Sequence, residues 1–309
     1  MVLDNSFAQC HLPVVLENKL NQLRELIRSY GSCLVAYSGG VDSVFLARVA
    51  REVLNDRSLA VIADSPSLPR RELQEALEIA DQFQIPVRVV RTNEFENPDY
   101  LANASNRCYF CKHELFDELT PIARKEGFAV IAYGENASDA GDFRPGAKAA
   151  AEFQVRAPLK EIGLTKAEIR ELSAQLGLPT ADKPQMACLS SRIPYGEAVT
   201  PDKLRMVEAA ENLLRDLGFY DVRVRHHELK NQTSLPPVTP ARDQAGRQSC
   251  SLARIEVGPA EIPKLLADET FTRVGEALKR IGYTHVTLDL QGYRRGSLNE
   301  TAASPARQA

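Results

Sequence analysis

The chain has 309 residues, of which 44% are hydrophobic and 26% are charged, and its formal net charge is −3. This composition is typical of a folded globular protein, and the length suits two domains. The balanced charge favours neither nucleic acid nor anionic membrane as a general partner. No apolar run of about 18 residues occurs and the start lacks a basic, then apolar, leader pattern. We therefore expect no membrane span, no signal peptide and a cytoplasmic location.

Helical and strand patterns alternate through the first part of the chain. Leu16, Leu20, Leu23 and Ile27 recur at helical spacing, and further helices are predicted from Asp42, over 69–83, over 115–125 and over 165–176. Short apolar runs at 34–36, 59–63, 86–90 and 129–133 predict buried strands. Strands that alternate with helices are typical of an α/β fold with a doubly wound parallel sheet.

A smaller α+β unit is predicted to follow. Residues 179–195 are irregular, so we expect one domain over 13–195 and a second over 196–298. The second has a helical pattern at 201–217, helical segments within 259–281, and strands at 221–226, 252–257 and 286–290. Residues 228–251 are rich in Pro, Gln and Ser, which predicts a mostly disordered surface insertion, and 299–309 is expected to be a frayed tail.

A glycine-rich loop, Ser38 to Val41, joins the first strand to the next helix, which starts at Asp42 and Ser43. Glycines let backbone N–H groups approach a ligand, and a helix N-terminus attracts anions. The loop lacks the lysine of a Walker A motif and the spacing of a dinucleotide motif. The alternative is an ordinary Gly-Gly turn. Because strand, loop, acid and helix follow in order, we favour a phosphate site.

Polar residues follow other strands at the sheet edge where ligands bind in open α/β folds. Asp64 and Ser65 come after the second strand, and Asn136, Asp139 and Arg144 come after the fourth. These side chains can bind a nucleotide, a metal or a substrate. A polar turn with a helix cap is the alternative, and the position at a strand end favours function.

The six cysteines are Cys10, Cys33, Cys108, Cys111, Cys188 and Cys250. Cys108 and Cys111 form a C-x-x-C pair, which occurs in zinc sites, redox dithiols and iron–sulfur sites. No second pair exists to complete a structural zinc site. Three cysteines, with Cys188 as the third, would suit a [4Fe-4S] cluster whose open iron could carry an extra sulfide. His113 is an alternative fourth ligand, although we expect it to face outward.

Seven motifs in order resemble the LarE family of ATP-dependent sulfur transferases, within the PP-loop ATP pyrophosphatases. They are Ser-Gly-Gly-Val-Asp-Ser at 38–43, Asn-Arg-Cys-Tyr-Phe-Cys-Lys at 106–112, Arg-Pro-Gly at 144–146, Ala-Cys-Leu-Ser-Ser-Arg at 187–192, Arg-Val-Arg at 223–225, Ala-Arg-Ile-Glu at 253–256 and Leu-Asp-Leu-Gln-Gly-Tyr-Arg at 288–294. Each motif is moderately specific, but the ordered set, from about residue 14 to 298, is highly specific. The segment 228–251 departs from the tight turn expected there, which leaves any contact between protomers through that hairpin open.

The resemblance implies a reaction in the biosynthesis of a nickel-pincer nucleotide. Pyridinium-3,5-biscarboxylic acid mononucleotide would be adenylated by ATP on a carboxylate, and a sulfur nucleophile would then displace AMP. Two sulfur sources occur in the family. Cys188 could give up its own sulfur, or Cys108, Cys111 and Cys188 could hold a [4Fe-4S] cluster that carries a sulfide. The C-x-x-C pair favours the cluster, so the implied cofactors are ATP, Mg²⁺ and the cluster.

The resemblance and the chemistry of the side chains together predict individual roles. Arginine forks suit a substrate phosphate, whereas a solvated strand face is the alternative for Arg223 and Arg225, and Glu256 could equally be an exposed carboxylate. ATP binding is assigned to Ala36, Tyr37, Ser38, Gly39, Gly40, Asp42, Ser43, Asp64, Ser65, Gly134 and Asn136. Substrate binding is assigned to Arg192, Arg223, Arg225, Asp139, Arg144 and Glu256, and sulfur chemistry to Cys108, Cys111 and Cys188.

Other functions that use the same loop remain open. A tRNA 2-thiolation enzyme would share the loop and the cysteines, but should show a basic face or an RNA-binding module. An amide-forming PP-loop ligase or an AMP-binding sensor would leave the cysteines without a task. We expect a small nucleotide as substrate, no membrane or nucleic-acid partner, and a homo-oligomer.

Overall fold

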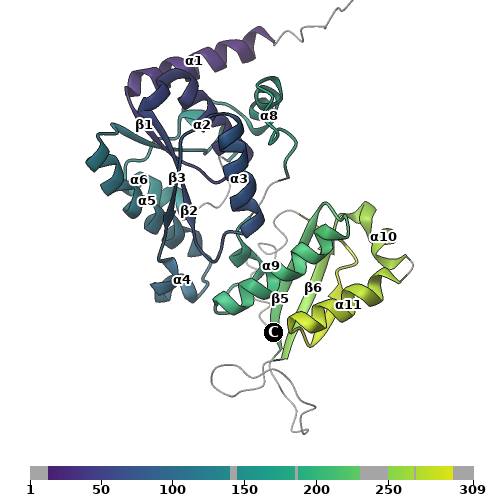
Figure 1. The fold of residues 1–309 in the computed structure, drawn as a ribbon. Coiled ribbons are helices and arrows are strands. Elements are labelled where there is room, and N and C mark those ends of the chain that lie inside the picture. Colours follow the sequence, from purple (N-terminus) through teal and green to yellow (C-terminus); the bar gives the residue numbers. More distant parts are fainter. Residues whose placement is uncertain (1–12, 140–144, 185–186, 230–249, 268, 295–309) are drawn as a thin grey trace, which may run out of the picture.

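The computed structural model describes residues 13–139, 145–184, 187–229, 250–267 and 269–294 (Figure 1). Two β-sheets organise this part of the chain, a four-stranded sheet and, after it in sequence, a three-stranded sheet. The predicted α/β fold with a second, smaller α+β unit is thereby confirmed. The predicted Arg144, most of the predicted insertion (230–249) and the tail from 295 lie outside the described residues.

The larger sheet is parallel throughout, with strand order β3-β2-β1-β4. Its strands are β1 (Cys33–Ala36), β2 (Ser58–Asp64), β3 (Val87–Arg91) and β4 (Val130–Tyr133). β1 pairs with β2 on one side and β4 on the other, with Ala36 opposite both Val61 and Tyr133. The carboxyl ends of β1 and β4 are therefore neighbours, as the sequence predicted, and this edge is where ligands bind in such folds.

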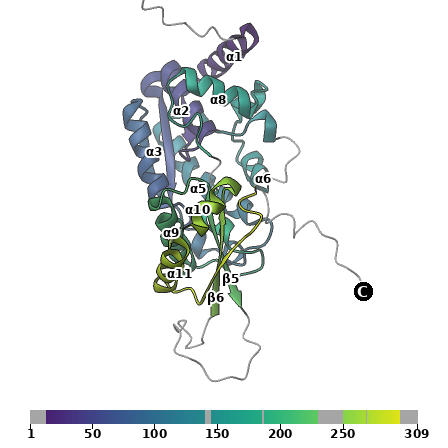
Figure 2. The same cartoon turned by 90° about the vertical axis from the view of Figure 1, so that its right-hand side faces the viewer.

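Helices cover both faces of this sheet, and Figure 2 shows α3 and α6 on opposite sides of it. One face packs against α1 (Val14–Tyr30), α2 (Val41–Leu54), α3 (Arg70–Gln82), α7 (Pro158–Glu161) and α8 (Lys166–Gln175). The other packs against α5 (Arg107–Glu126) and α6 (Pro145–Glu152). α8 begins with a capping box, in which Thr165 and Glu168 each bond the other's backbone N–H.

The start of α5 differs from the sequence prediction. The helix begins at Arg107 rather than near residue 115, so Cys108 and Cys111 lie in its first turns. The apolar pattern begins late because the fully buried Phe116 and Leu119 lie from the middle of the helix onward, whereas Tyr109 and Phe110 of the first turns are only partly buried. Helical spacing of three places the two cysteines on neighbouring positions of one helix face.

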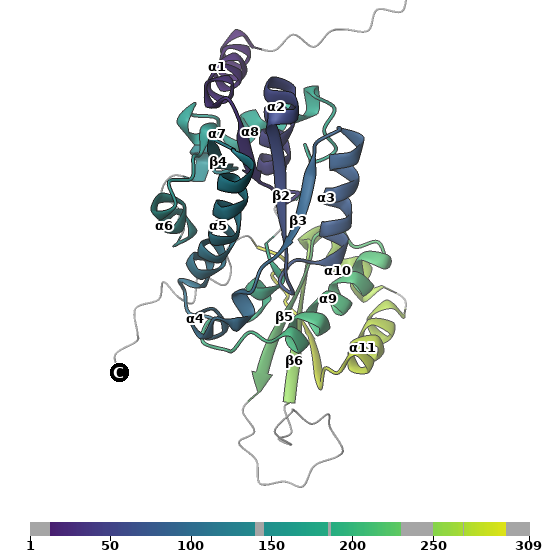
Figure 3. The same cartoon turned by 60° about the vertical axis from the view of Figure 1, so that its left-hand side comes forward.

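The smaller sheet has strand order β5-β6-β7, with β5 (Val222–Leu229) antiparallel to β6 (Cys250–Val257) and β7 (His285–Leu288) parallel to β6. Its core contains side chains of α9 (Pro201–Asp216), α10 (Ile262–Leu266) and α11 (Thr270–Ile281). Figure 3 shows α9 and α11 on the same side of β5 and β6. Both strands are longer than predicted: residues 228, 229, 250 and 251 belong to them rather than to an insertion.

A separate apolar cluster joins the two units. Tyr100, within α4 (Pro98–Leu101), packs with Leu189 and Ile193, and with Leu204 and Val207 of α9. The irregular segment that carries Cys188 therefore lies against both units. We keep the end of this segment, residue 195, as a proposed domain boundary.

Candidate active site

The glycine-rich loop has the tight conformation that its sequence predicts. Gly39 has a φ of +71°, and a Cβ at this position would lie 2.6 Å from the Cβ of Ala76. The hydroxyl of Ser43 lies 3.0 Å from that of Ser38 and accepts the Ser38 N–H at 3.1 Å. Gly40 is the N-cap of α2 and has no side chain to occupy the first N–H groups of the helix. These groups and the helix dipole suit an anion.

This loop forms one wall of a pocket of about 460 Å³, a volume typical of small-molecule sites. The end of β4 contributes Tyr133 and Gly134, and α5 contributes Cys108 and Lys112. The pocket thus brings a phosphate loop and a thiol into one space. This placement is the observation on which the functional proposal depends.

Most residues predicted to bind ATP lie in this pocket. Ala36, Tyr37, Ser38, Gly40, Asp42, Ser43 and Gly134 line it. Gly39 supports the loop from behind, against α3. In the part of the chain that the structure describes, Asp64, Ser65 and Asn136 are not among the lining residues: Asp64 pairs with Arg70, and Ser65 bonds Ser67 at 2.8 Å. Their predicted contact with ATP stays a prediction.

Asp42 is the carboxylate at the centre of the loop wall. Its Oδ2 accepts a hydrogen bond of 2.7 Å from Lys166 Nζ, whereas Oδ1 is buried without a hydrogen-bond partner among the described residues. Burial raises the pKa of this carboxyl, Lys166 lowers it, and neighbouring Asp139 raises it. A buried, half-satisfied carboxylate beside a phosphate loop is a suitable ligand for Mg²⁺.

Two lysines of the pocket were missed by the sequence analysis. Lys112 Nζ lies 4.2 Å from the centroid of the Tyr133 ring, and Lys166 pairs with Asp42. Both line the pocket, where their charges can offset those of phosphates. Lys112 directly follows the C-x-x-C pair, and this position in the sequence could have indicated a functional role. Lys166 is 124 residues from Asp42, and only the fold brings the two together.

The three predicted cysteines come together although Cys188 is far along the chain. Cys108 lines the pocket and is exposed to solvent. The pKa of its thiol is raised, first by desolvation and then by the nearby Cys188. The pKa of the Cys111 thiol is raised well above its usual value by burial, then by Glu94, Cys188 and Cys108. Cys111 also packs against the apolar cluster that contains Leu189, the residue after Cys188, so the segments that carry the three thiols adjoin; of the three, Cys108 lines the pocket.

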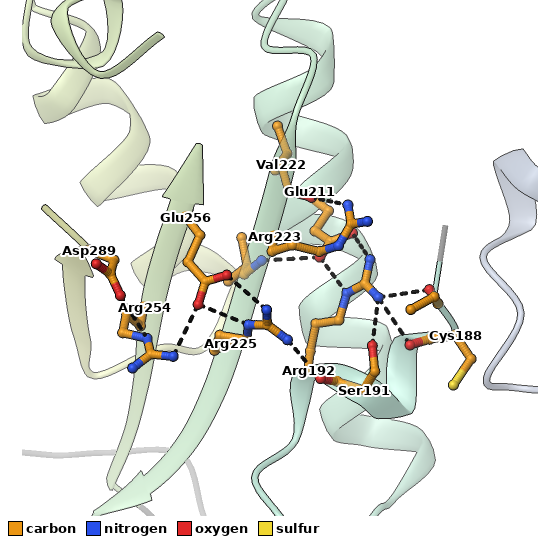
Figure 4. Close-up of polar contacts among 12 residues, drawn as sticks. Cys188, Ser191, Arg192, Glu211, Val222, Arg223, Arg225, Arg254, Glu256 and Asp289 are labelled. Atoms are coloured by element: carbon orange, nitrogen blue, oxygen red, sulfur yellow. Dashed lines mark hydrogen bonds and ion pairs between the residues drawn. The ribbon is translucent and has the colours of Figure 1, made fainter. Parts of the chain in front are cut away.

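The Cys188 segment is held by a fully buried arginine. Arg192 is 0% exposed and donates to the carbonyls of Ala187 at 2.7 Å and Cys188 at 3.1 Å (Figure 4). Its Nε and Nη2 form a fork with Glu211, at 2.8 and 3.1 Å. The Cys188 sulfur points away from this guanidinium in Figure 4. Arg192 therefore fixes the backbone that presents the thiol, and its predicted contact with a substrate phosphate stays a prediction.

The other predicted substrate residues continue this network into the smaller sheet. Arg225 forms a fork with Glu256, at 3.0 and 2.8 Å, and donates to the Ser191 carbonyl at 2.9 Å. Arg223 lies over the Tyr293 ring, and burial and nearby Arg192 lower its pKa. Arg223, Arg225 and Glu256 are only 4%, 5% and 1% exposed. The alternatives of a solvated strand face and an exposed carboxylate are therefore wrong.

Two further candidates from the sequence are Asp139 and His113. Asp139 lies in the wall of the ATP pocket and accepts the Asn136 N–H at 3.2 Å. The ring of His113 packs edge-on against the ring of Phe153, with ring centroids 4.9 Å apart. Within the described ranges, no three His, Cys, Asp or Glu side chains converge closely enough to hold a single metal ion.

Comparisons with known proteins extend this picture. Residues 15–105, which carry the loop, match the NAD synthase family. The chain is 42% identical to an uncharacterized protein of Synechocystis, over 92% of this chain and 98% of that one. It is 33% identical to the pyridinium-3,5-bisthiocarboxylic acid mononucleotide synthase of Lactiplantibacillus plantarum, over 86% of this chain and 88% of that one.

The chain belongs to the LarE family of PP-loop proteins. More distantly, it is 24% identical to a glutamine-hydrolyzing GMP synthase chain of Archaeoglobus fulgidus, over 67% of this chain and 71% of that one. The match to the GMP synthase chain thus covers a smaller share of this chain than the match to the bisthiocarboxylic acid mononucleotide synthase. Among the described helices, none is both long and apolar enough to cross a membrane.

Proposed function

We propose that this protein is an ATP-dependent sulfur transferase that makes thiocarboxylates on pyridinium-3,5-biscarboxylic acid mononucleotide. The reaction belongs to the biosynthesis of a nickel-pincer nucleotide. The observation that carries the proposal is the single pocket in which the phosphate loop and Cys108 face one space. The relative of 33% identity, named as a synthase of the bisthiocarboxylic product, supports the choice of substrate.

The first step is adenylation of a substrate carboxylate. A carboxylate oxygen attacks the α-phosphorus of ATP, the bond to the β-phosphate breaks, and pyrophosphate leaves into the loop. The N–H groups at the start of α2 and the hydroxyls of Ser38 and Ser43 hold this leaving group. Lys112 and Lys166 offset the negative charge that a Walker lysine offsets elsewhere.

Mg²⁺ suits the residues of this wall. Asp42 Oδ1 is a buried oxygen without a hydrogen-bond partner among the described residues, and Asp139 lies close enough to raise the Asp42 pKa. Oxygen ligands of this kind, together with phosphate oxygens, are those that Mg²⁺ prefers. The ion would supply further neutralisation of the triphosphate, while Lys166 holds the Asp42 side chain in place.

The second step replaces AMP by sulfur. A sulfur nucleophile attacks the carbonyl carbon of the acyl adenylate, the carbon–oxygen bond to phosphate breaks, and AMP leaves. Cys108 lies in the pocket wall, with Cys111 and Cys188 beside it. Cysteines beside the site of adenylation would supply the attacking sulfur, and this role distinguishes the proposal from an amide-forming ligase.

Three thiols suit a [4Fe-4S] cluster that keeps one iron without a protein ligand. Cys188 contributes to the raised pKa of both the Cys108 and the Cys111 thiol, which supports their action as one group. Cys108, Cys111 and Cys188 would hold the cluster, which would supply a sulfide on the iron that has no protein ligand. The alternative is sacrificial transfer of the Cys188 sulfur itself, for which Cys108 and Cys111 would not be required.

The arginine network suits the phosphate of the mononucleotide. Arg192, Arg223 and Arg225 surround the carboxylates of Glu211 and Glu256, so these five side chains carry a net positive charge. A phosphate near Arg223 and Arg225 would balance that charge and place the pyridinium ring toward Cys188. The substrate would then lie between the smaller sheet and the ATP pocket.

Anaerobic reconstitution with iron and sulfide, followed by a sulfur-transfer assay, tests the proposal. We expect cluster absorbance and several product molecules per protein. Cys108→Ala should abolish both, whereas the matched Cys250→Ala, on β6 outside the thiol group, should abolish neither. Several turnovers by Cys108→Ala would contradict the cluster, and loss of one sulfur from Cys188 in the intact mass would establish the sacrificial route.

A further inference from the structure

A second contact, independent of Arg192, joins the C-x-x-C helix to the Cys188 segment. Asn103, just before α5, is 0% exposed and has a φ of +54°, a conformation that asparagine tolerates better than most residues. Its Nδ2 donates to the carbonyls of Pro194 at 2.7 Å and Glu197 at 2.9 Å. Its own carbonyl accepts the Gly196 N–H at 3.0 Å. One side chain therefore fixes the turn that ends the Cys188 segment.

Arg107 completes this contact from the first residue of α5. It is 4% exposed, and its Nη1 donates to Asn103 Oδ1 and, at 2.9 Å, to the carbonyl of Ser190. Ser190 lies two residues after Cys188, and Arg107 directly precedes Cys108. The two cysteines are thus attached to one guanidinium through short stretches of backbone.

We propose that Asn103 and Arg107 are positioning residues that set the separation of Cys108 and Cys188 for sulfur transfer. The proposal rests on the proposed function and deepens it. Neither residue lines the ATP pocket, so the adenylation step does not require them. Sulfur transfer does, because a displacement of about 1 Å of a reacting group can cost about a hundredfold in rate.

The separation of the thiols can be measured without any assay of activity. A short bifunctional maleimide is added to the protein without iron, and the peptide that links Cys108 to Cys188 is quantified by mass spectrometry. One variant is Arg107→Met, which removes both hydrogen bonds of the guanidinium but keeps a long side chain. The other is Asn103→Gly, which removes the amide but allows the same positive φ. The matched controls are Arg124→Met and Asn106→Ala, exposed residues at the end and at the N-cap of the same helix.

We expect both test variants to lower the yield of the linked peptide at least threefold, and the controls to match the wild type. Arg107→Lys, which keeps the charge on a shorter side chain, should give an intermediate yield. A wild-type yield in folded Arg107→Met and Asn103→Gly protein would overturn the proposal. Thermal unfolding identifies the folded fraction, and if Arg107→Met does not fold, Arg107→Lys decides the same question.

Activity gives the second readout. Substrate-dependent pyrophosphate release, which reports adenylation, should stay within twofold of the wild type in Arg107→Lys and Asn103→Gly in a single turnover, while thiocarboxylate formation falls at least tenfold. An equal fall in both would show a general structural role and overturn the proposal. If the wild type makes no thiocarboxylate, the proposed function fails, whereas the crosslinking result still decides the positioning role.

Discussion

The phosphate loop and the thiol group adjoin the same pocket but are built in different ways. The loop is one continuous stretch, from Ser38 to Ser43, and local contacts shape it: Ser38 bonds Ser43, and Ser43 donates to the Gly40 carbonyl at 3.0 Å, while Asp42 alone of its side chains pairs with a distant lysine, Lys166. The thiol group combines two turns of α5 with a segment about eighty residues later in the chain. It is held in place by buried charges, of which Arg192 and Glu211 are the most deeply buried pair.

This difference has a physical consequence. A loop of N–H groups needs only its glycines and the start of a helix, so it tolerates change elsewhere in the chain. A group fixed by buried ion pairs depends on each partner, because the loss of one leaves an unpaired buried charge. Substitutions should therefore affect activity alone on the loop side, and activity together with stability on the thiol side.

The largest expected effect on the loop side comes from Asp42→Asn. The change removes the candidate Mg²⁺ ligand and the ion pair with Lys166 but keeps the size of the side chain. Substrate-dependent pyrophosphate release should fall by about 10²–10³-fold, the cost of one lost group that stabilises charge in a transition state. The melting temperature should change little. Asp56→Asn, whose side chain is 96% exposed, is the control, and equal rates in both variants would contradict the role of Asp42.

On the thiol side, Glu211→Ala should reduce stability as well as sulfur transfer. Arg192 would be left buried without its carboxylate, which typically costs about 3–5 kcal/mol. Chemical denaturation measures this loss in the free energy of unfolding. Glu276→Ala, whose side chain is 65% exposed, should change it by less than about 0.5 kcal/mol. If Glu211→Ala lowered the free energy of unfolding by as little as Glu276→Ala does, the claim that buried ion pairs hold the thiol side together would be wrong.

The ion pair of Arg192 and Glu211 should also make the stability of the protein depend on pH. Burial raises the pKa of Glu211, but Arg192 outweighs this effect and the net pKa is lowered. The stabilisation is therefore present above the unfolded value of about 4.3 and is lost as the pH falls through the folded pKa. Glu211→Gln should lack this acid-dependent loss, so equal acid profiles for both proteins would contradict the assignment.

The smallest expected effect comes from Lys166→Met. Burial already raises the pKa of Asp42, and Lys166 counteracts this by stabilising the carboxylate. Its removal should raise that pKa further, so the acidic limb of the adenylation rate should move to higher pH, with a loss of about tenfold near neutrality. Lys125→Met, exposed at the end of α5, is the control. An unchanged acidic limb would show that Asp42 does not act as a carboxylate in this step.

The same contrast explains what the sequence could predict. The alternation of strands and helices depends on local patterns, and the α/β fold that it predicts is confirmed. The three cysteines were predicted as a group from their chemistry and from resemblance to a family, since nothing local in the sequence connects Cys188 to Cys108. In the structure, Cys111 packs against the cluster that contains Leu189, the residue after Cys188.

What the sequence could not predict are the partners of charged residues far apart in the chain. The motif around Arg225 indicated a function but not the fork to Glu256, which only the pairing of β5 with β6 creates. Lys166 gave no sign of its contact with Asp42, and the late apolar pattern of α5 placed the start of that helix too far along the chain. The burial of Arg223, Arg225 and Glu256 likewise follows from the packing of the smaller sheet and not from any local pattern.

The most direct test of the central claim is a comparison of the two half-reactions in Cys188→Ala. Substrate-dependent release of pyrophosphate and formation of thiocarboxylate are measured in the same anaerobic sample, with Cys250→Ala as control. The account predicts that the variant adenylates the substrate at the wild-type rate and makes no thiocarboxylate, because the loop and the thiols are separately built. Thiocarboxylate formed at the wild-type rate by Cys188→Ala would contradict it.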